Sequence, residues 1–166
     1  MRIKIILACV MVLALATVVG AQTKISGTIK CNKPDPQYGI DIGDRPNHGF
    51  GIDKSNCAWT KPWEIAGVQS KDGYSVGFGE TSGNKATGRG YHVGTMASGD
   101  KFYVRFQGTD TYKDGAPQTA EGTWSFTGGT GKLKGIKGKG TYKGTAAADG
   151  SITYEADGEY ELPKKK

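Results

Sequence analysis

Two histidines are the side chains best suited to acid–base chemistry, because imidazole titrates near neutral pH. His48 lies in a segment that also holds Asp44 and Arg45, whereas His92 follows Tyr91 on a predicted strand. Nothing in the spacing brings the two histidines together, and neither stands at metal-ligand spacing from a cysteine. The sequence therefore predicts no catalytic residue, no metal site and no cofactor.

Aromatic side chains form the second group that could bind a ligand. Trp59 and Trp63 flank a Lys-Pro pair, and Phe50 stands near His48 in the same segment. Such rings can line the mouth of a barrel and stack on a flat molecule or a sugar, or they can plug one end of the barrel as core. Together with the histidines, the candidate ligand-binding residues are His48, Phe50, Trp59, Trp63, Tyr91 and His92.

A glycine-rich stretch at Gly128–Lys132 has only a superficial likeness to a phosphate-binding loop. A P-loop needs glycine where Phe126 stands and serine or threonine where Leu133 stands. The glycine spacing of a dinucleotide fold and the GxSxG of a nucleophile elbow are also missing. These motifs give no support for nucleotide binding or for acyl transfer.

The composition limits the fold classes. The chain has 166 residues, of which 27 are glycine, and its 3 Trp, 8 Tyr and 5 Phe all follow residue 21. Leu, Ile, Val and Phe are scarce after that point, which argues against a helix bundle, a coiled coil and a membrane-spanning body. A small, glycine-rich β domain with an aromatic core fits these numbers.

Residues 1–21 have the pattern of a cleaved secretory signal: two early positive charges, an uncharged run from Ile5 to Val19, and Val-Gly-Ala before the cut. The run is too short to span a bilayer comfortably, so no membrane span is expected after cleavage. Cys31 and Cys57 then remain, and an even pair in an exported chain predicts one disulfide. We expect a secreted or periplasmic protein.

After the leader, short alternating segments predict about eight strands with turns between them. Lys24–Lys30 is the first, and 31–62 is expected to be an irregular segment closed by the disulfide. The other predicted strands are Trp63–Gln69, Tyr74–Glu80, Gly90–Met96, Lys101–Gln107, Glu121–Phe126, Lys137–Thr145 and Ser151–Leu162. The domain 22–163 is thus an antiparallel barrel or sandwich, followed by a basic tail at 164–166. The expected interior is Tyr74, Val76, Phe78, Phe102, Val104, Phe106, Trp124, Phe126, Tyr154 and Tyr160.

The last two strands predict a hairpin whose register is fixed by charge. Lys137, Lys139 and Lys143 fall on one face of the first strand, and the carboxylates of 155–161 fall on one face of the second. Opposite charges across strands stabilise the pairing, and a slip by one residue would bury the carboxylates. Because the acids neutralise the lysine run, the sequence predicts no nucleic-acid partner.

The stretch from Glu121 to Tyr142, EGTWSFTGGTGKLKGIKGKGTY, resembles the penultimate turn of the allene oxide cyclase and dirigent-like barrel families. The match covers 121–162, and the rest of the chain looks like a little-characterised group of small exported bacterial proteins. The resemblance implies a single eight-stranded antiparallel β-barrel with an interior cavity, and relatives that cyclise or orient apolar small molecules. Gly128, Gly129, Gly131 and Gly135 would form a tight corner, capped by Leu133 and Ile136.

Three functions follow as hypotheses. The first is an exported barrel that binds a small apolar or aromatic molecule without catalysis. The second is an extracellular or envelope interaction module that uses the 31–62 segment, with a hydrophobic patch around Phe50, Trp59 and Trp63. The third is a cyclase-type enzyme, which requires Glu80, Tyr91 or His92 to point into the barrel. A homo-oligomer is possible in each case.

Overall fold

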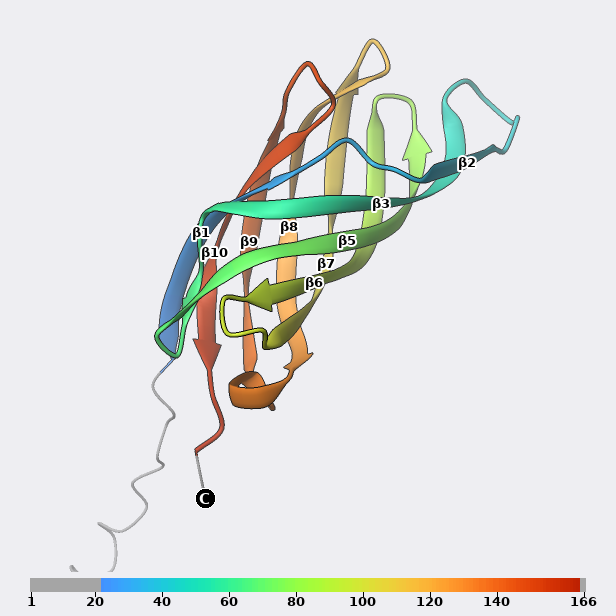
Figure 1. The fold of residues 1–166 in the computed structure, drawn as a ribbon. Helices are drawn as coiled ribbons and strands as arrows, with labels where there is room; N and C mark the ends of the chain where they lie inside the picture. The colour runs from blue at the N-terminus through green and yellow to red at the C-terminus, as the bar shows by residue number, and fades with distance from the viewer. Residues whose placement is uncertain (1–21, 165–166) are drawn as a thin grey trace, which may run out of the picture.

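Antiparallel β-strands make up almost all of the computed structural model, which describes residues 22–164 (Figure 1). The strands are β1 (Thr23–Cys31), β2 (Gln37–Asp41), β3 (His48–Lys61), β4 (Glu64–Ile65), β5 (Val68–Ser82), β6 (Lys85–Met96), β7 (Lys101–Lys113), β8 (Ala116–Gly129), β9 (Lys137–Ala146) and β10 (Ile152–Glu161). A 3₁₀ turn, η1 (Gly131–Leu133), joins β8 to β9. No helix in this part of the chain is long and apolar enough to cross a membrane.

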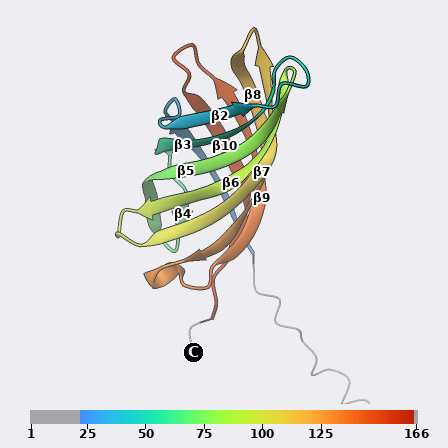
Figure 2. The same cartoon turned by 90° about the vertical axis from the view of Figure 1, so that its right-hand side faces the viewer.

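The sheet closes into a barrel because β3 pairs with both β1 and β5. Strands β1, β10, β9, β8, β7, β6, β5 and β3 form the closed ring, which confirms the predicted eight-stranded antiparallel barrel. Two short strands are additional: β2 pairs with the first half of β3, and β4 with the start of β5. We call the end with η1 the lower end and the opposite end, with the β7–β8 and β9–β10 turns, the upper end (Figures 1 and 2).

The segment 31–62 is not irregular, and that prediction is wrong for most of its length. It contains β2 and all of β3, which leaves only 32–36, 42–47 and Pro62 outside strands. Phe50 and Ile52 face outward, whereas the inward face of β3 carries small or polar residues that end in Ser55 and Cys57. Hydrophobic periodicity marks a buried face only where that face carries the larger side chains.

The predicted disulfide is confirmed. Cys31 and Cys57 lie directly opposite each other on β1 and β3, with Cα atoms 4.0 Å apart, and both side chains are buried. The bond ties the first strand to the closing strand of the barrel. A structural disulfide of this kind is typical of an oxidising compartment. The predicted leader at 1–21 and the final two residues of the basic tail lie outside the described residues.

The side chains of β5 that were predicted to face the interior face outward. Tyr74, Val76 and Phe78 point outward, and Phe78 remains 47% exposed. Glycines and a serine face inward instead, because rings from other strands fill that space: a Cβ at Gly77 would contact Phe106, and one at Gly73 would overlap His92. Of the other predicted interior residues, Phe102, Val104, Trp124, Phe126 and Tyr160 are buried, while Phe106 and Tyr154 are half-buried on the inner face.

The lower half of the barrel is packed with aromatic rings around Trp63. Its ring centroid lies 4.6 Å from that of Trp59 and 4.8 Å from that of Trp124, and its Nε1 donates to the carbonyl of Ala156 at 3.3 Å. Trp63 follows Pro62 and precedes β4, so it is not on a strand running from 63 to 69 as predicted. The chain instead turns at 66–67 before β5 begins. Trp63 plugs the barrel as core.

The glycine corner closes the lower end as expected. Leu133 and Ile136 are buried there, and Gly131 and Gly135 have positive φ values of 50° and 79°. Gly129 packs so closely on this corner that a Cβ would lie 2.7 Å from Cβ of Leu133. The β9–β10 register also agrees with the charge argument, since Lys143, Lys139 and Lys137 face Glu155, Glu159 and Glu161.

Inward-facing glycines receive the rings of neighbouring strands. Phe102 lies over Gly94, and Trp124 lies over Gly140 and Gly158, where Cβ atoms would come within 2.7 Å and 2.5 Å of the indole. A ring that covers a glycine compensates the missing side chain, and the glycine gives the ring room inside a narrow barrel.

The substitution Gly94→Ala should destabilise the fold, because its methyl group would overlap Cζ of Phe102, a fully buried ring. We expect a loss of about 2–3 kcal/mol in the free energy of unfolding, measured by urea denaturation. The matched control is Gly39→Ala, where the added Cβ would lie an ordinary 3.7 Å from the Phe50 carbonyl oxygen. Equal stability of the two variants would contradict the role of Gly94.

Candidate functional site

The upper half of the barrel interior carries polar side chains. We call Asp53, Asp110, Tyr112, Tyr142 and Tyr154 the Asp–Tyr cluster. The face of β7 that buries Phe102 and Val104 continues by alternation through Phe106 to Asp110, and on to Tyr112. Asp53 shares the inner face of β3 with Ser55 and Cys57, and the two other tyrosines alternate with inward small residues on β9 and β10. The cluster thus draws on four strands of the ring.

The rings of the cluster meet at their edges. The ring centroid of Tyr142 lies 5.8 Å from that of Tyr154 at an interplanar angle of 78°, and 6.5 Å from that of Phe106 at 90°. The Tyr142 hydroxyl reaches over Gly108 and Gly122, where a Cβ at the latter would lie 2.6 Å from it. The ring is therefore held in place by two strands that have no side chain on their inner face at this level.

The two carboxyl groups lack a cationic partner. Within residues 22–164 no ion pair involves Asp53 or Asp110, and every lysine and arginine there is exposed. Burial raises the pKa of both carboxyls, and burial with the nearby charge of Asp53 brings the pKa of Asp110 to about 6. Burial, and then the charge of Asp110, raises the pKa of Tyr112 and Tyr142. These phenols are protonated donors at neutral pH.

Solvent reaches the cluster in part, because all five of its side chains face the interior yet remain partly exposed. Gly88 also faces inward and has no ring to cover it: the atoms nearest to a Cβ there would be backbone atoms, the closest being the Phe78 carbonyl oxygen at 3.2 Å. The upper interior thus combines hydrogen-bonding groups with aromatic rings.

The six candidate residues do not form one site. Trp59, Trp63 and His92 lie inside the barrel, and the first two are parts of the lower core. Phe50 and Tyr91 are exposed on the outer face, and His48 is buried there beneath the 42–47 loop. The patch around Phe50, Trp59 and Trp63 that the interaction hypothesis required is therefore not formed.

His48 holds the 42–47 loop against β5. Hydrogen bonds to Glu80 and then to Asp44 raise its pKa, and in the charged form its Nε2 donates to Oε1 of Glu80 at 2.8 Å while Nδ1 donates to Asp44. Arg45 also joins this contact, donating to Asp44 at 2.7 Å and to Ser82 at 3.1 Å. These ion pairs and hydrogen bonds fix the loop on the outside of the barrel.

His92 is the one member of the cyclase hypothesis that points inward. Its Nδ1 lies 3.0 Å from the Ser75 hydroxyl, and burial lowers its pKa to about 4, so the ring is neutral. Its buried Nε2, like Nε1 of Trp59, has no hydrogen-bond partner within residues 22–164. Glu80 and Tyr91 point outward, so the convergence that the hypothesis required is not formed.

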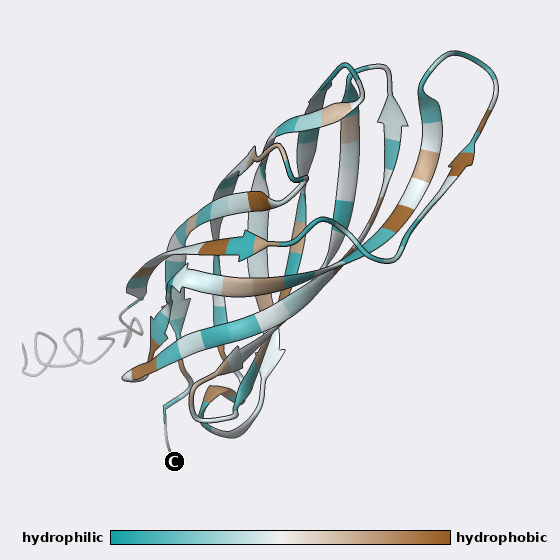
Figure 3. Cartoon of the chain, turned by 45° about the horizontal axis from the view of Figure 1, so that its top comes forward, coloured by the Kyte–Doolittle hydropathy of each residue, from teal (hydrophilic) through white to brown (hydrophobic). Residues whose placement is uncertain are grey.

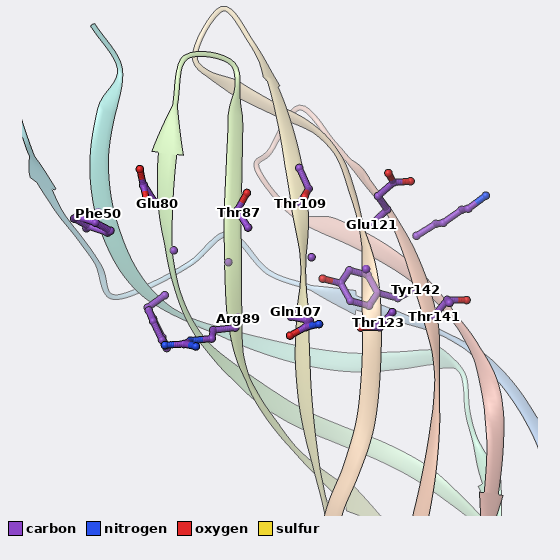
Figure 4. Close-up of a pocket in the computed structure, with 16 residues that line it drawn as sticks. Phe50, Glu80, Thr87, Arg89, Gln107, Thr109, Glu121, Thr123, Thr141 and Tyr142 are labelled. Carbon is purple, nitrogen blue, oxygen red and sulfur yellow. The ribbon is translucent and has the colours of Figure 1, made fainter. Parts of the chain in front are cut away.

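The outer face has an open hollow of 940 Å³ that crosses β5 to β9 (Figure 4). Glycines form its floor, and outward side chains such as Arg89, Gln107 and Glu121 form its sides. Exposed large hydrophobic residues gather next to it, on β2, β3, β5 and β6. The hydropathy colouring in Figure 3 shows hydrophobic positions along β2 and the first half of β3. They are Tyr38, Ile40, Phe50, Ile52, Tyr74, Val76, Phe78 and Tyr91, with Ile42 in the loop after β2.

The fold is an all-β closed barrel of eight antiparallel strands with two additional short strands, as the resemblance at 121–162 implied. The chain is similar in structure to a pyocyanin demethylase (19% identity, 80% of this chain and 98% of that one, TM-score 0.42). It is also similar to a DUF3224-family protein of unknown function from Shewanella oneidensis (15%, 87% and 100%, 0.49) and to the pterocarpan synthase dirigent protein GePTS1 (13%, 88% and 87%, 0.46). No protein-family model matches the sequence, and no curated protein matches it.

The sequence reasoning missed Asp53, Asp110 and Tyr112. A usable signal existed for two of them, because the alternation of Phe102, Val104 and Phe106 continues in phase to Asp110 and Tyr112. The predicted strand ended at Gln107, where the hydrophobic residues stop, and so the inner face appeared to stop there. Asp53 had no such signal, since β3 carries its hydrophobic residues on the outside.

Replacing Asp110 with asparagine should stabilise the protein at neutral pH. A carboxyl whose pKa rises from 3.8 to about 6 on folding weakens the fold as pH increases through that interval, because the folded state binds the proton more tightly. We expect Asp110→Asn to gain on the order of 1–2 kcal/mol at pH 7.5, after allowance for its partial exposure, and almost nothing at pH 3.5. Thermal unfolding at both pH values measures this.

The matched control is Asp157→Asn, an identical change on the exposed outer face of β10. It should leave the pH profile of stability unchanged. An Asp110→Asn protein that is less stable than the wild type at pH 7.5 would contradict the unpaired state of this carboxyl.

Proposed function

We propose that this protein is a non-catalytic binding protein for a small molecule with an aromatic ring, held in the upper interior of the barrel. The observation that carries the proposal is the Asp–Tyr cluster: hydrogen-bonding and aromatic side chains face the inside of a closed barrel, remain partly exposed, and two of them lack an ionic partner. Groups arranged in this way are typical of ligand sites, which combine apolar walls with a few convergent polar groups.

The width and rigidity of the upper interior support the proposal. An eight-stranded barrel can hold one small ligand, and here Gly88 and Gly79 leave the inner wall without side chains. Tyr142 is held over Gly108 and Gly122, so little conformational entropy is lost when a ligand stacks on it. The protonated phenols can donate hydrogen bonds, and the carboxylates can accept them.

A binding role is favoured over a cyclase role because the groups that the enzyme hypothesis required are separated. Glu80 is engaged with His48 on the outer face, and Tyr91 is exposed there. His92 alone faces inward, and it is neutral and packed near Phe102, with ring centroids 5.9 Å apart.

The substitution Gly88→Leu should block the site, because Gly88 is on the inner face of β6 and a leucine side chain there would project inward beside the cluster. A ligand is first found by native mass spectrometry of the exported protein and by a calorimetric screen of small aromatic molecules. We expect at least a tenfold loss of affinity in Gly88→Leu. Thr87→Leu, which adds the same side chain on the outer face one residue away, should bind like the wild type. Full affinity in Gly88→Leu would contradict the interior site.

A second candidate is an interaction module that pairs with its own copy through the 31–62 segment. Tyr38, Ile52 and Phe78 stand opposite one another on β2, β3 and β5, as do Ile40 and Phe50, and all are exposed. β2 is an edge strand with no partner beyond β3 in the described sheet, and it carries no lysine or proline to block pairing. Two antiparallel copies of β2 can pair about a twofold axis and bring the two apolar faces into one sheet.

This second candidate predicts a dimer that Ile40→Lys disrupts, because an added charge at an edge strand opposes pairing. Sedimentation velocity over a range of protein concentrations measures the mass. Thr109→Lys, on the outer face of β7, is the control and should leave the dimer intact. A wild-type protein that stays monomeric at high concentration would exclude the candidate.

A further inference from the structure

We propose that the molecule bound in the upper interior is a small organic cation, an ammonium or ring-nitrogen cation attached to an aromatic ring. The inference rests on the proposed function and specifies the charge of its ligand. It depends on two independent features of the upper interior: the sign of the charges that face it, and the way its rings are arranged.

The charges that face the interior are of one sign. Asp53 on β3 and Asp110 on β7 point inward from strands that are not neighbours in the sheet. No lysine or arginine of residues 22–164 is buried with them, and neither acid takes part in an ion pair there. Buried charges in proteins are normally paired, so the place of a counter-ion beside these two acids is open to a ligand.

Aromatic rings gather beside the acids. Tyr142 packs edge to face with Tyr154 and Phe106, at interplanar angles of 78° and 90°. The faces of such rings are electron-rich and attract organic cations, alkylated ammonium groups among them. Tyr112 faces inward on the same strand as Phe106 and adds a further ring.

Ligands of other charge fit these groups less well. An anion would meet two carboxylates, and a neutral molecule would leave both of them without a counter-charge. A divalent metal ion is disfavoured as well, because residues 22–164 contain no group of three His, Cys, Asp or Glu side chains that could hold one. An organic cation uses both the acids and the rings.

The test compares three probes of similar size on the full chain after export: phenyltrimethylammonium, its neutral isostere tert-butylbenzene, and the anion benzenesulfonate. Calorimetry gives the affinity, and NMR shifts of the tyrosine ring protons report where each probe binds. We expect phenyltrimethylammonium to bind at least tenfold more tightly than tert-butylbenzene, and benzenesulfonate to bind most weakly.

The double variant Asp53→Asn/Asp110→Asn removes the charge and keeps the shape of both side chains. It should lose at least tenfold in affinity for phenyltrimethylammonium and keep its affinity for tert-butylbenzene. The control variant Glu121→Gln/Asp157→Asn removes two acids from the outer face and should bind all three probes like the wild type. Circular dichroism verifies that each variant is folded.

The outcomes separate the two levels of the proposal. If tert-butylbenzene or benzenesulfonate binds as tightly as phenyltrimethylammonium and shifts the same tyrosines, the cation inference is wrong and the interior site stands. If the double variant binds the cation as well as the wild type does, the role of the two acids is wrong. If none of the probes binds and no small molecule accompanies the exported protein, the proposed function fails as well.

Discussion

The contact between aromatic rings and inward-facing glycines is the constraint on which this barrel depends. With few leucines and valines available, most of the buried apolar surface must come from large planar side chains. A barrel of eight strands is too narrow to hold such rings on every strand at one level. Glycine on the neighbouring strand provides the width, as Gly94 does for Phe102 and as Gly140 and Gly158 do for Trp124. The unusual glycine content is therefore a packing requirement of an aromatic core.

The matching of rings with glycines differs between the two halves of the barrel. At the lower end, rings and glycines are matched, and Trp63 fills the centre while Leu133 and Ile136 close the end. At the upper end, glycines outnumber rings: Tyr142 covers Gly108 and Gly122, but Gly79 and Gly88 meet only backbone. The upper interior is thus the place where the glycine pattern continues without a ring to cover every glycine. The proposed binding site follows from the packing rule of the core without any special loop or insertion.

Sequence reasoning succeeded where large side chains mark the buried face. The strand through Phe102, Val104 and Phe106, the β9–β10 hairpin with its lysine and carboxylate rows, and the Cys31–Cys57 bond all agree with prediction. It failed on β3 and on the face of β5, because there the inner face consists of glycine and small polar residues and the large ones lie outside. Which glycine faces a ring is decided by pairing across the sheet, and one strand read alone does not contain that information. Asp53 was missed for the same reason, whereas Asp110 was missed because the predicted strand ended at Gln107, where the hydrophobic residues stop.

The two acids of the upper interior lower the stability of the fold at the place where we propose that a ligand binds. Asp110 is held with a pKa of about 6 because it is buried and lies near the charge of Asp53, and it forms no ion pair within the described chain. An empty barrel therefore carries an electrostatic cost at neutral pH that a leucine or an asparagine at this position would remove. A carboxyl whose pKa is raised in this way inside a barrel marks a candidate site. A bound cation would remove the cost and add its own contacts, so ligand binding and thermal stability should rise together.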